Sequence, residues 1–274
     1  VVFSPRLQYS IAPYWNKDIV FRLAAGYYRQ PPFYREMRDF EGGLNTDLRA
    51  QSSLHLIAGM DWNLLFWGRP FKFIMEGYYK DLWDVVAYDL DNVRLRYYAT
   101  NDTRAQVVGA DFRLSGEFIP GTQSWFNLSL LSAREDVTFD ERGDIRRPSD
   151  QRVTFSFFFE DHLPNDPSIR VNIRTLFGSG LPYGPPNSPQ FRQALSSASR
   201  YVRSDIGFSK IFSIKRQSGK RSLESVWVGL EVLNLFGVDN NISFTWVPDF
   251  SGLQFAVPNS LSQRFFNLRT VLRY

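Results

Sequence analysis

The 274-residue chain contains no cysteine, and it has only two histidines and three methionines. The absence of cysteine excludes disulfide bonds and thiolate metal sites within this sequence. No stretch approaches the roughly 20 consecutive apolar residues that a membrane-spanning helix needs. Strands that cross a membrane alternate apolar and polar residues, so a transmembrane β-barrel remains open.

Sequence signatures of catalysis and nucleotide binding are also missing. No glycine-rich phosphate loop follows a strand and opens a helix. His55 shares a predicted strand face with Asp61, and His162 follows Asp161, so a hydrolytic His–Asp pair is conceivable. Neither histidine lies in a nucleophile motif or at zinc-site spacing, and both are expected to make structural polar contacts. No enzyme activity, metal or cofactor is predicted.

Charge is nearly balanced, with 32 basic and 28 acidic residues. Arginine and lysine are spread over nearly all of the strand-like segments, so no nucleic-acid partner is predicted. Aromatic residues are abundant, with 25 Phe, 13 Tyr and 7 Trp. A soluble phenylalanine-rich core would account for them, but a lipid-facing band with interfacial aromatic girdles agrees better with the alternation described next.

Apolar and polar residues alternate along most of the chain. In the last segment, Phe266, Leu268, Thr270, Leu272 and Tyr274 fall on one side of an extended strand. The same pattern predicts about thirteen strands, most of them long enough to cross a bilayer at a tilt. They cover residues 3–15, 19–28, 53–66, 71–82, 93–99, 106–118, 124–135, 151–161, 169–177, 202–212, 225–236, 241–247 and 264–274.

The predicted fold is all-β. A soluble β-sandwich and a transmembrane antiparallel β-barrel produce the same alternation. Strand length, strand number and the aromatic residue at the end of the last strand favour the barrel.

Several longer stretches resemble a known family. They are Tyr28–Glu36, Arg147–Arg152, Gly180–Pro186, Tyr201–Ser209, and Leu233–Gly237, which resembles an N-L-F-D turn with Gly237 where Asp is usual. Together they resemble the barrel of Bacteroidota-type TonB-dependent outer-membrane receptors, the group that often carries a carboxypeptidase-regulatory-like N-terminal module. The resemblance spans essentially all 274 residues.

The resemblance implies a 22-strand barrel in the bacterial outer membrane, with residues 1–274 as its C-terminal part. Nothing in the sequence resembles the family's plug or TonB box, so the plug and the first strands are expected to precede this chain. The implied function is energised uptake of an unidentified ligand. The implied partners are outer-membrane lipid, the missing strands and plug, a TonB-type energy transducer and, in some relatives, a surface lipoprotein. A passive porin, another barrel type including a barrel enzyme, and a soluble β-sandwich binding module are the alternatives.

The resemblance also implies roles for the last strand and for the loops. Phe266, Leu268, Leu272 and Tyr274 would belong to a C-terminal strand that the insertion machinery recognises. With a periplasmic C-terminus, counting back over thirteen strands gives the two sides. Extracellular segments would be 30–52, 83–92, 119–123, 161–168, 213–224 and 248–263. Periplasmic segments would be 15–18, 66–70, 100–105, 136–150, 178–201 and 237–240.

Candidate functional residues fall into two sets. Charges on the polar strand faces are expected to face the lumen or plug: Arg22, Lys72, Glu76, Arg94, Arg96, Asp111, Arg113, Glu117, Arg152, Glu160, Arg170, Arg174 and Glu231. They would pair with one another or with the plug, or line a pathway for an anionic or polar ligand. Ligand-contact candidates on the loops are Phe33, Tyr34, Arg35, Arg38, Trp246, Phe250 and Phe255, for which packing between loops is the alternative.

Overall fold

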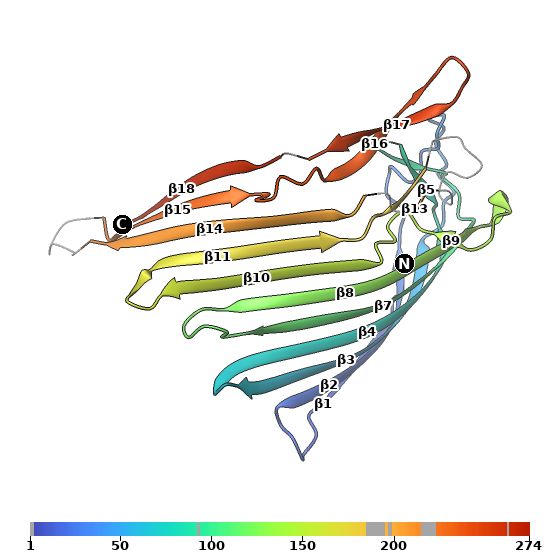
Figure 1. Ribbon diagram of the computed structural model, residues 1–274. Helices are drawn as coiled ribbons and strands as arrows, with labels where there is room; N and C mark the ends of the chain where they lie inside the picture. The colour runs from blue at the N-terminus through green and yellow to red at the C-terminus, as the bar shows by residue number, and fades with distance from the viewer. Residues whose placement is uncertain (1–2, 92–93, 185–194, 197–198, 215–222, 262) are drawn as a thin grey trace.

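The computed structural model describes residues 3–91, 94–184, 195–196, 199–214, 223–261 and 263–274. Its main feature is a broad, curved antiparallel sheet (Figure 1). The strands are β1 (Arg6–Ile11), β2 (Ile19–Gln30), β3 (Gln51–Phe66), β4 (Arg69–Val85), β5 (Tyr88–Asp91), β6 (Arg94–Tyr97), β7 (Thr103–Gly116), β8 (Ser124–Val137), β9 (Ile145–Arg146), β10 (Val153–Leu163), β11 (Asp166–Gly178), β12 (Pro182–Tyr183), β13 (Leu195–Ser196), β14 (Tyr201–Ser213), β15 (Ser225–Leu233), β16 (Asn241–Pro248), β17 (Gln254–Ser260) and β18 (Phe265–Arg273). One 3-10 helix, η1 (Thr138–Asp140), interrupts the strands of the described part.

The sheet follows the order of the chain. Its path is β1-β2-β3-β4-β7-β8-β10-β11-β14-β15-β18, and β9 pairs with β8 as a twelfth strand. Tight turns join neighbours at one end. Trp67 and Gly68 connect β3 to β4 with φ angles of 54° and 71°. Positive φ at both central residues gives the turn the twist that paired strands require.

The pairing register separates two faces of the sheet. Arg22 lies opposite Gly59, Gly59 opposite Glu76, and Glu76 opposite Asp111. Directly opposite residues point to the same face, so this polar face continues across the sheet. The expected inward charges on the wall strands all share it: Arg22, Lys72, Glu76, Asp111, Arg113, Glu160, Arg170, Arg174 and Glu231.

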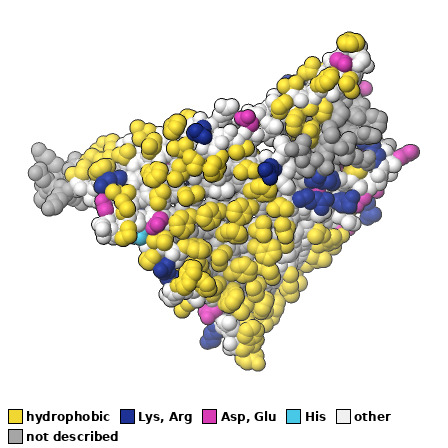
Figure 2. Space-filling view, viewed as in Figure 1, with side chains coloured by type: hydrophobic (Ala, Val, Ile, Leu, Met, Phe, Trp, Pro, Cys, Tyr) yellow, Lys and Arg dark blue, Asp and Glu magenta, His cyan; other side chains and the backbone are white. Residues whose placement is uncertain are grey.

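The opposite face is apolar. Phe21, Met60, Met75 and Phe112 form a continuous row across four strands. Hydrophobic side chains cover the face turned to the viewer in Figure 2. Large apolar groups stay exposed there, including Phe208, of which 51% is exposed. Exposed apolar surface of this extent needs a lipid or protein covering.

Two of the thirteen predicted wall strands lie elsewhere. Residues 93–99 contribute β6, which pairs with β5, and residues 241–247 contribute β16, which pairs with β17. Both pairs are hairpins within connections between wall strands, so the described sheet path has eleven strands instead of about thirteen. A short alternating run predicts a strand, but it does not specify the strand's partner.

This difference corrects the predicted sidedness. The described residues of the longer connections 31–50, 86–102, 138–152, 179–200 and 234–264 all lie at one end of the sheet, hereafter the loop end. The C-terminus lies at the opposite end, hereafter the turn end (Figure 1). The described residues of 136–150 and 178–201 therefore share an end with 30–52, whereas 119–123, 161–168 and the described residues of 213–224 lie at the other. Because two hairpins were counted as wall strands, each connection between these hairpins was predicted at the opposite end of the sheet from where it lies.

The most tightly buried apolar side chains lie at the loop end. Val85, Val86, Ala99, Val137 and Ile145 are each less than 5% exposed. They pack where β4, β7 and β8 leave the sheet, so the connections form an ordered layer above it. β1 and β18 end the sheet path and do not pair with each other in the described chain. No helix among the described residues has the length and hydrophobicity to cross a membrane.

Candidate ligand-binding region at the loop end

Many charges on the polar face pair with one another. The Asp61 carboxylate accepts from the Arg22 guanidinium at 2.5 Å and from Lys72 Nζ at 3.0 Å. Arg170 Nη1 lies 2.7 Å from Glu160 Oε1. These contacts cross from strand to strand and neutralise much of the face, which agrees with the pairing alternative raised from the sequence.

The other predicted inward charges have varied surroundings. Glu231 accepts a hydrogen bond from Asn267 Nδ2 at 2.9 Å, and Asp111 accepts one from Ser129 Oγ at 2.5 Å. The Arg174 guanidinium lies 5.8 Å from the centre of the Phe158 ring. Glu76 and Arg113 share the same face.

Four of these residues lie outside the expected positions. Arg94 and Arg96 are on β6, in a loop-end hairpin instead of a wall strand. Glu117 follows β7 at the turn end, and Arg152 precedes β10 at the loop end.

The connection between β8 and β10 is held by a buried ionic cluster. The Asp150 side chain is fully buried and accepts from Arg146 Nε at 2.6 Å, Arg152 Nε at 2.8 Å and the Ala133 backbone N–H at 2.7 Å. Buried carboxylates are stable only when they are paired and hydrogen-bonded. Asp150 therefore fixes the position of this connection against β8.

A second buried carboxylate, on β8, pairs with an arginine of this connection that also contacts the β5–β6 hairpin. Glu135 is fully buried, and Arg147 Nε lies 3.3 Å from its Oε2. The Arg147 guanidinium also lies 5.8 Å from the centre of the Tyr88 ring on β5, within cation–π range. The β5–β6 hairpin and the 138–152 connection are thus tied together.

The first long connection, residues 31–50, packs on the same hairpin. The Phe40 and Tyr98 rings lie 4.7 Å apart, and the Arg96 guanidinium lies 4.9 Å from the Phe40 ring. Nearby, burial of the Tyr97 side chain raises the pKa of its phenol, and the Glu36 carboxylate adds to that effect. Residues 31–50 and the β5–β6 hairpin therefore pack closely on each other.

The predicted ligand contacts of this connection lie mostly on its surface. Phe33 and Tyr34 are 64% and 61% exposed. Arg38 donates a 2.6 Å hydrogen bond to the Tyr34 hydroxyl, whereas Arg35 follows Tyr34 in the same turn and is exposed. These four side chains lie at the loop end but are not in the cavity described next.

A cavity of about 400 Å³ lies between the ends of β10, β11 and β14 and the β16–β17 hairpin. Its volume falls within the range of small-molecule sites, roughly 300–1,000 Å³. The described residues that line it are Leu90, Pro148, Gln151, Thr154, Leu176–Gly184, Ser199, Tyr201, Asn241–Phe244 and Trp246.

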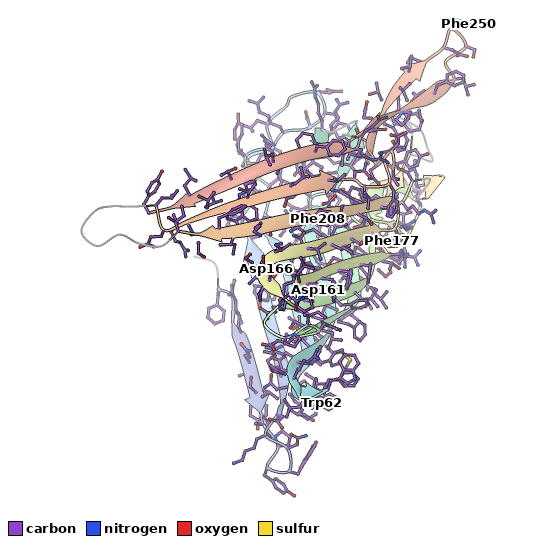
Figure 3. The ribbon with its side chains drawn as sticks, turned by 60° about the vertical axis from the view of Figure 1, so that its left-hand side comes forward. Trp62, Asp161, Asp166, Phe177, Phe208 and Phe250 are labelled. Carbon is purple, nitrogen blue, oxygen red and sulfur yellow. The ribbon has the colours of Figure 1, made fainter. Side chains whose placement is uncertain are left out.

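Three aromatic rings form one side of this cavity. Tyr183 and Phe244 are stacked, with ring centres 4.1 Å apart and planes inclined by 13°. The Trp246 ring centre lies 6.0 Å from that of Tyr183. Of the seven predicted ligand-contact residues, only Trp246 lines the cavity. Phe250 is fully exposed at the tip of the projecting hairpin, and Phe255 is on β17 (Figure 3).

The cavity also contains four residues that were not predicted from the sequence as ligand contacts: Tyr183, Phe244, Tyr201 and Gln151. Each belongs to, or lies beside, a stretch that was recognised only as a family resemblance or as a short strand. Tyr183 belongs to the Gly180–Pro186 stretch, which the sidedness prediction placed at the wrong end. The part of that stretch beyond Gly184 lies outside the described residues.

The two histidines make structural contacts. His55 Nε2 lies 3.0 Å from Ser53 Oγ, and its ring centre lies 4.4 Å from that of Tyr28, with the two ring planes tilted by 32°. The backbone N–H of His162 donates to Asp161 Oδ1 at 2.6 Å. Within the described ranges, no group of three or more potential side-chain ligands is arranged to hold a metal ion.

Three solved structures share this fold. The ferric-catecholate import receptor Fiu from Escherichia coli, in its closed form, matches with a TM-score of 0.61 at 17% identity. The copper transporter OprC matches with 0.64 at 15%, and the outer membrane transporter YddB from Escherichia coli with 0.62 at 10%. Each match covers 97% of this chain, but only 34%, 39% and 40% of those structures. No protein-family model and no curated protein sequence matches the chain.

The likeness defines the fold. The sheet has the fold of part of a transmembrane antiparallel β-barrel, as the sequence predicted. The chain spans between a third and two fifths of the length of those transporters.

Proposed function

We propose that residues 1–274 form the C-terminal part of the barrel of a TonB-dependent receptor in the bacterial outer membrane. In this proposal the loop end is extracellular, and the polar face lines the interior around a plug formed by the preceding part of the protein. Uptake of the ligand is driven by a TonB-type energy transducer in the inner membrane.

One observation carries this proposal: charged and polar side chains share one face of a transporter-type barrel wall, whereas the opposite face is apolar and exposed. A lipid-facing outside and a polar inside are the arrangement of large outer-membrane barrels. The two unpaired edges also support additional strands, because an open edge is not stable in lipid.

Membership of the Bacteroidota-type group is part of the same proposal. It is supported by where the resembling stretches lie. Arg147–Arg152 forms the ionic cluster, and Gly180–Gly184 lines the cavity. Asn234, from Leu233–Gly237, has a φ of 52° and its backbone N–H donates to Asp205 Oδ1 at 2.8 Å. The N-terminal carboxypeptidase-regulatory-like module and a surface lipoprotein partner remain predictions from the resemblance.

Nutrient depletion by living cells tests the proposed transport. Strains lacking this protein, lacking the energy transducer, or lacking neither are grown in the same medium, and the compounds removed are compared by mass spectrometry. An energised receptor predicts at least one compound whose depletion is lost in both deletion strains. Depletion that depends on this protein but persists without the transducer would identify a passive porin instead.

A further inference from the structure

We infer that the cavity lined on one side by Tyr183, Phe244 and Trp246 recognises an uncharged aromatic or heteroaromatic ring of the ligand. The inference rests on the proposed function, because it names the kind of compound that the receptor would admit. The cavity lies beside the polar face, between the ends of β10, β11 and β14 and the β16–β17 hairpin.

Among the residues that the structure describes, the lining of the cavity is uncharged. Every described side chain that lines it is aliphatic, aromatic or neutral polar. On β14, whose Tyr201 lines the cavity, Arg203 and Asp205 pair with each other, with Arg203 Nε 2.8 Å from Asp205 Oδ1. A charged ligand group buried here would lose its hydration without gaining a counterion, which is costly. An uncharged group avoids that cost.

The aromatic side chains select for a flat ring. The stacked Tyr183 and Phe244 rings and the nearby Trp246 ring bring three π-systems to one side of the cavity. Offset or edge-to-face contact between rings stabilises a bound aromatic ring beyond the effect of the buried area. Leu176, on the adjoining wall, adds apolar surface.

Neutral polar groups at the rim are held in place. Gln151 Nε2 donates to the Ser179 carbonyl at 3.0 Å, and Gln151 Oε1 accepts from Thr154 Oγ1 at 3.1 Å. A Cβ added at Gly178 would lie 2.5 Å from Gln151 Nε2, so this glycine leaves the amide its space. A fixed amide beside apolar rings can orient the ring nitrogen or hydroxyl of a ligand.

The hairpin that carries two of the rings is anchored to the barrel wall. Asn240, directly before β16, accepts from the Val202 backbone N–H at 2.8 Å and donates to the Val202 carbonyl at 2.9 Å. Asn240 is itself only 3% exposed. Anchoring of this kind holds Phe244 and Trp246 near the cavity before any ligand binds, which lowers the entropic cost of binding.

The test uses three probes with the same ring and different charge. The whole protein is placed in lipid nanodiscs, because detergent could enter an apolar cavity. Binding of 5-fluorotryptophol, 5-fluoroindole-3-acetate and 5-fluorotryptamine is followed by fluorine NMR. The inference predicts that the neutral alcohol binds at least tenfold more tightly than the anion and the cation. No binding of the alcohol, or binding of a charged probe as tight as the alcohol's, would overturn it.

Variants then locate the site. Phe244→Ala and Trp246→Ala are each expected to weaken binding of 5-fluorotryptophol at least tenfold, and Trp246→Phe to restore most of the affinity. Phe250→Ala, on the same hairpin but fully exposed at its tip, is the matched control and should leave binding unchanged. Equal loss in the Phe250 variant, or displacement of the probe by the neutral sugar maltose, would contradict a ring site here.

The two proposals can fail independently. Binding in nanodiscs needs no energy source, whereas the depletion experiment depends on the transducer. Transducer-dependent uptake without ring binding would reject the ring site alone. Ring binding with transducer-independent uptake would reject energised transport alone.

Discussion

Single carboxylates hold the loop-end connections in place. Asp150 gathers two arginines and a backbone N–H, and Asp249 closes the tip of the β16–β17 hairpin by accepting from Ser251 Oγ at 2.7 Å and the Leu253 backbone N–H at 2.9 Å. The first is fully buried and the second is near solvent. Their different surroundings lead to different predictions.

Removing the charge of Asp150 should destabilise the 138–152 connection. Asp150→Asn leaves Arg146 and Arg152 without their buried partner, and breaking such a pair by removing one member costs about 3–5 kcal/mol. Differential scanning calorimetry in detergent measures the loss of stability, and hydrogen exchange locates it in this connection.

Asp144→Asn is the matched control. Asp144 lies 3.5 Å from Arg134 in a pair whose side chains are 60% and 49% exposed. Exposed pairs contribute little, so stability should change by about 0.5 kcal/mol or less. Equal unfolding temperatures for the two variants would disprove the role given to Asp150.

Acid should open the tip of the β16–β17 hairpin. The Ser251 hydroxyl, with help from neighbouring backbone N–H groups, holds the pKa of Asp249 below its ordinary value of 3.8. A lowered pKa in the folded state means that the stabilisation is complete above that ordinary value. It is lost as the pH falls through the lower, folded-state value.

Hydrogen exchange of the Ser251 and Leu253 amides measures this opening. Rates at about pH 5 and about pH 2.5 are each normalised to those of an unfolded peptide, and protection should fall at the lower pH. Asp249→Asn cannot ionise, so its protection should be weaker and independent of pH over this range. An acid-dependent loss of equal size in that variant would assign the transition to another group.

Individual residues were the hardest feature to predict from the sequence. Alternation assigned each wall charge to the correct face, because the period of two is a local property. Whether Arg152 pairs with Asp150 or with a residue on a distant strand depends on how residues 138–152 fold. The alternation of apolar and polar residues does not predict that fold. Phe244 was missed for the same reason, since its role comes from Tyr183, 61 positions away in the chain.

Among the strands, glycines on the polar face let large rings lie flat. A Cβ on Gly109 would overlap the Tyr78 ring from the next strand, and one on Gly229 would overlap Trp227. Aromatic side chains that cover strand glycines in this way protect the local backbone and leave the interior open. These pairs of a glycine and an aromatic ring are therefore a feature of the wall strands and not of the loops.

Gly109→Ala should lower stability by about 1–2 kcal/mol, because Tyr78 must leave its place on the strand. Gly77→Ala is the matched control. Gly77 is the neighbour of Tyr78 on β4, and nothing lies within 4 Å of the position its Cβ would take. The control should be neutral or slightly stabilising, since alanine restricts the unfolded chain more than glycine. Thermal unfolding in detergent compares the two, and equal losses would contradict the proposed covering role.

Strand positions were predictable, whereas two strand partners were not. The long segments 53–66 and 106–118 appear as β3 and β7 with nearly the expected bounds. Segments 93–99 and 241–247 alternate equally well, but each turns back on its neighbour in a hairpin. Alternation reports a half-buried extended segment, and long-range pairing decides whether it joins the wall.

For the whole molecule, the central feature is a curved sheet with one apolar and one polar face. The fold class followed from the sequence because that pattern repeats over the whole chain. Sidedness did not follow, since it depends on the parity of the strand count, and two misassigned hairpins inverted the middle of the barrel. Each end of the sheet has a residue that can be used to locate it. Phe250 lies at the loop end, and Asn165 lies at the turn end, between β10 and β11.

Cysteine accessibility in living cells tests most directly whether the sheet lies in the outer membrane with its loop end outside the cell. The 274 residues contain no cysteine, so Phe250→Cys and Asn165→Cys each introduce one thiol into this part of the protein. Intact cells are treated with a membrane-impermeant maleimide, and the unsubstituted protein gives the background. If the loop end is extracellular, the Phe250 variant is labelled in intact cells, and the Asn165 variant is labelled only after the outer membrane is permeabilised. Labelling of the Asn165 variant alone in intact cells, or recovery of the protein outside the outer-membrane fraction, would contradict it.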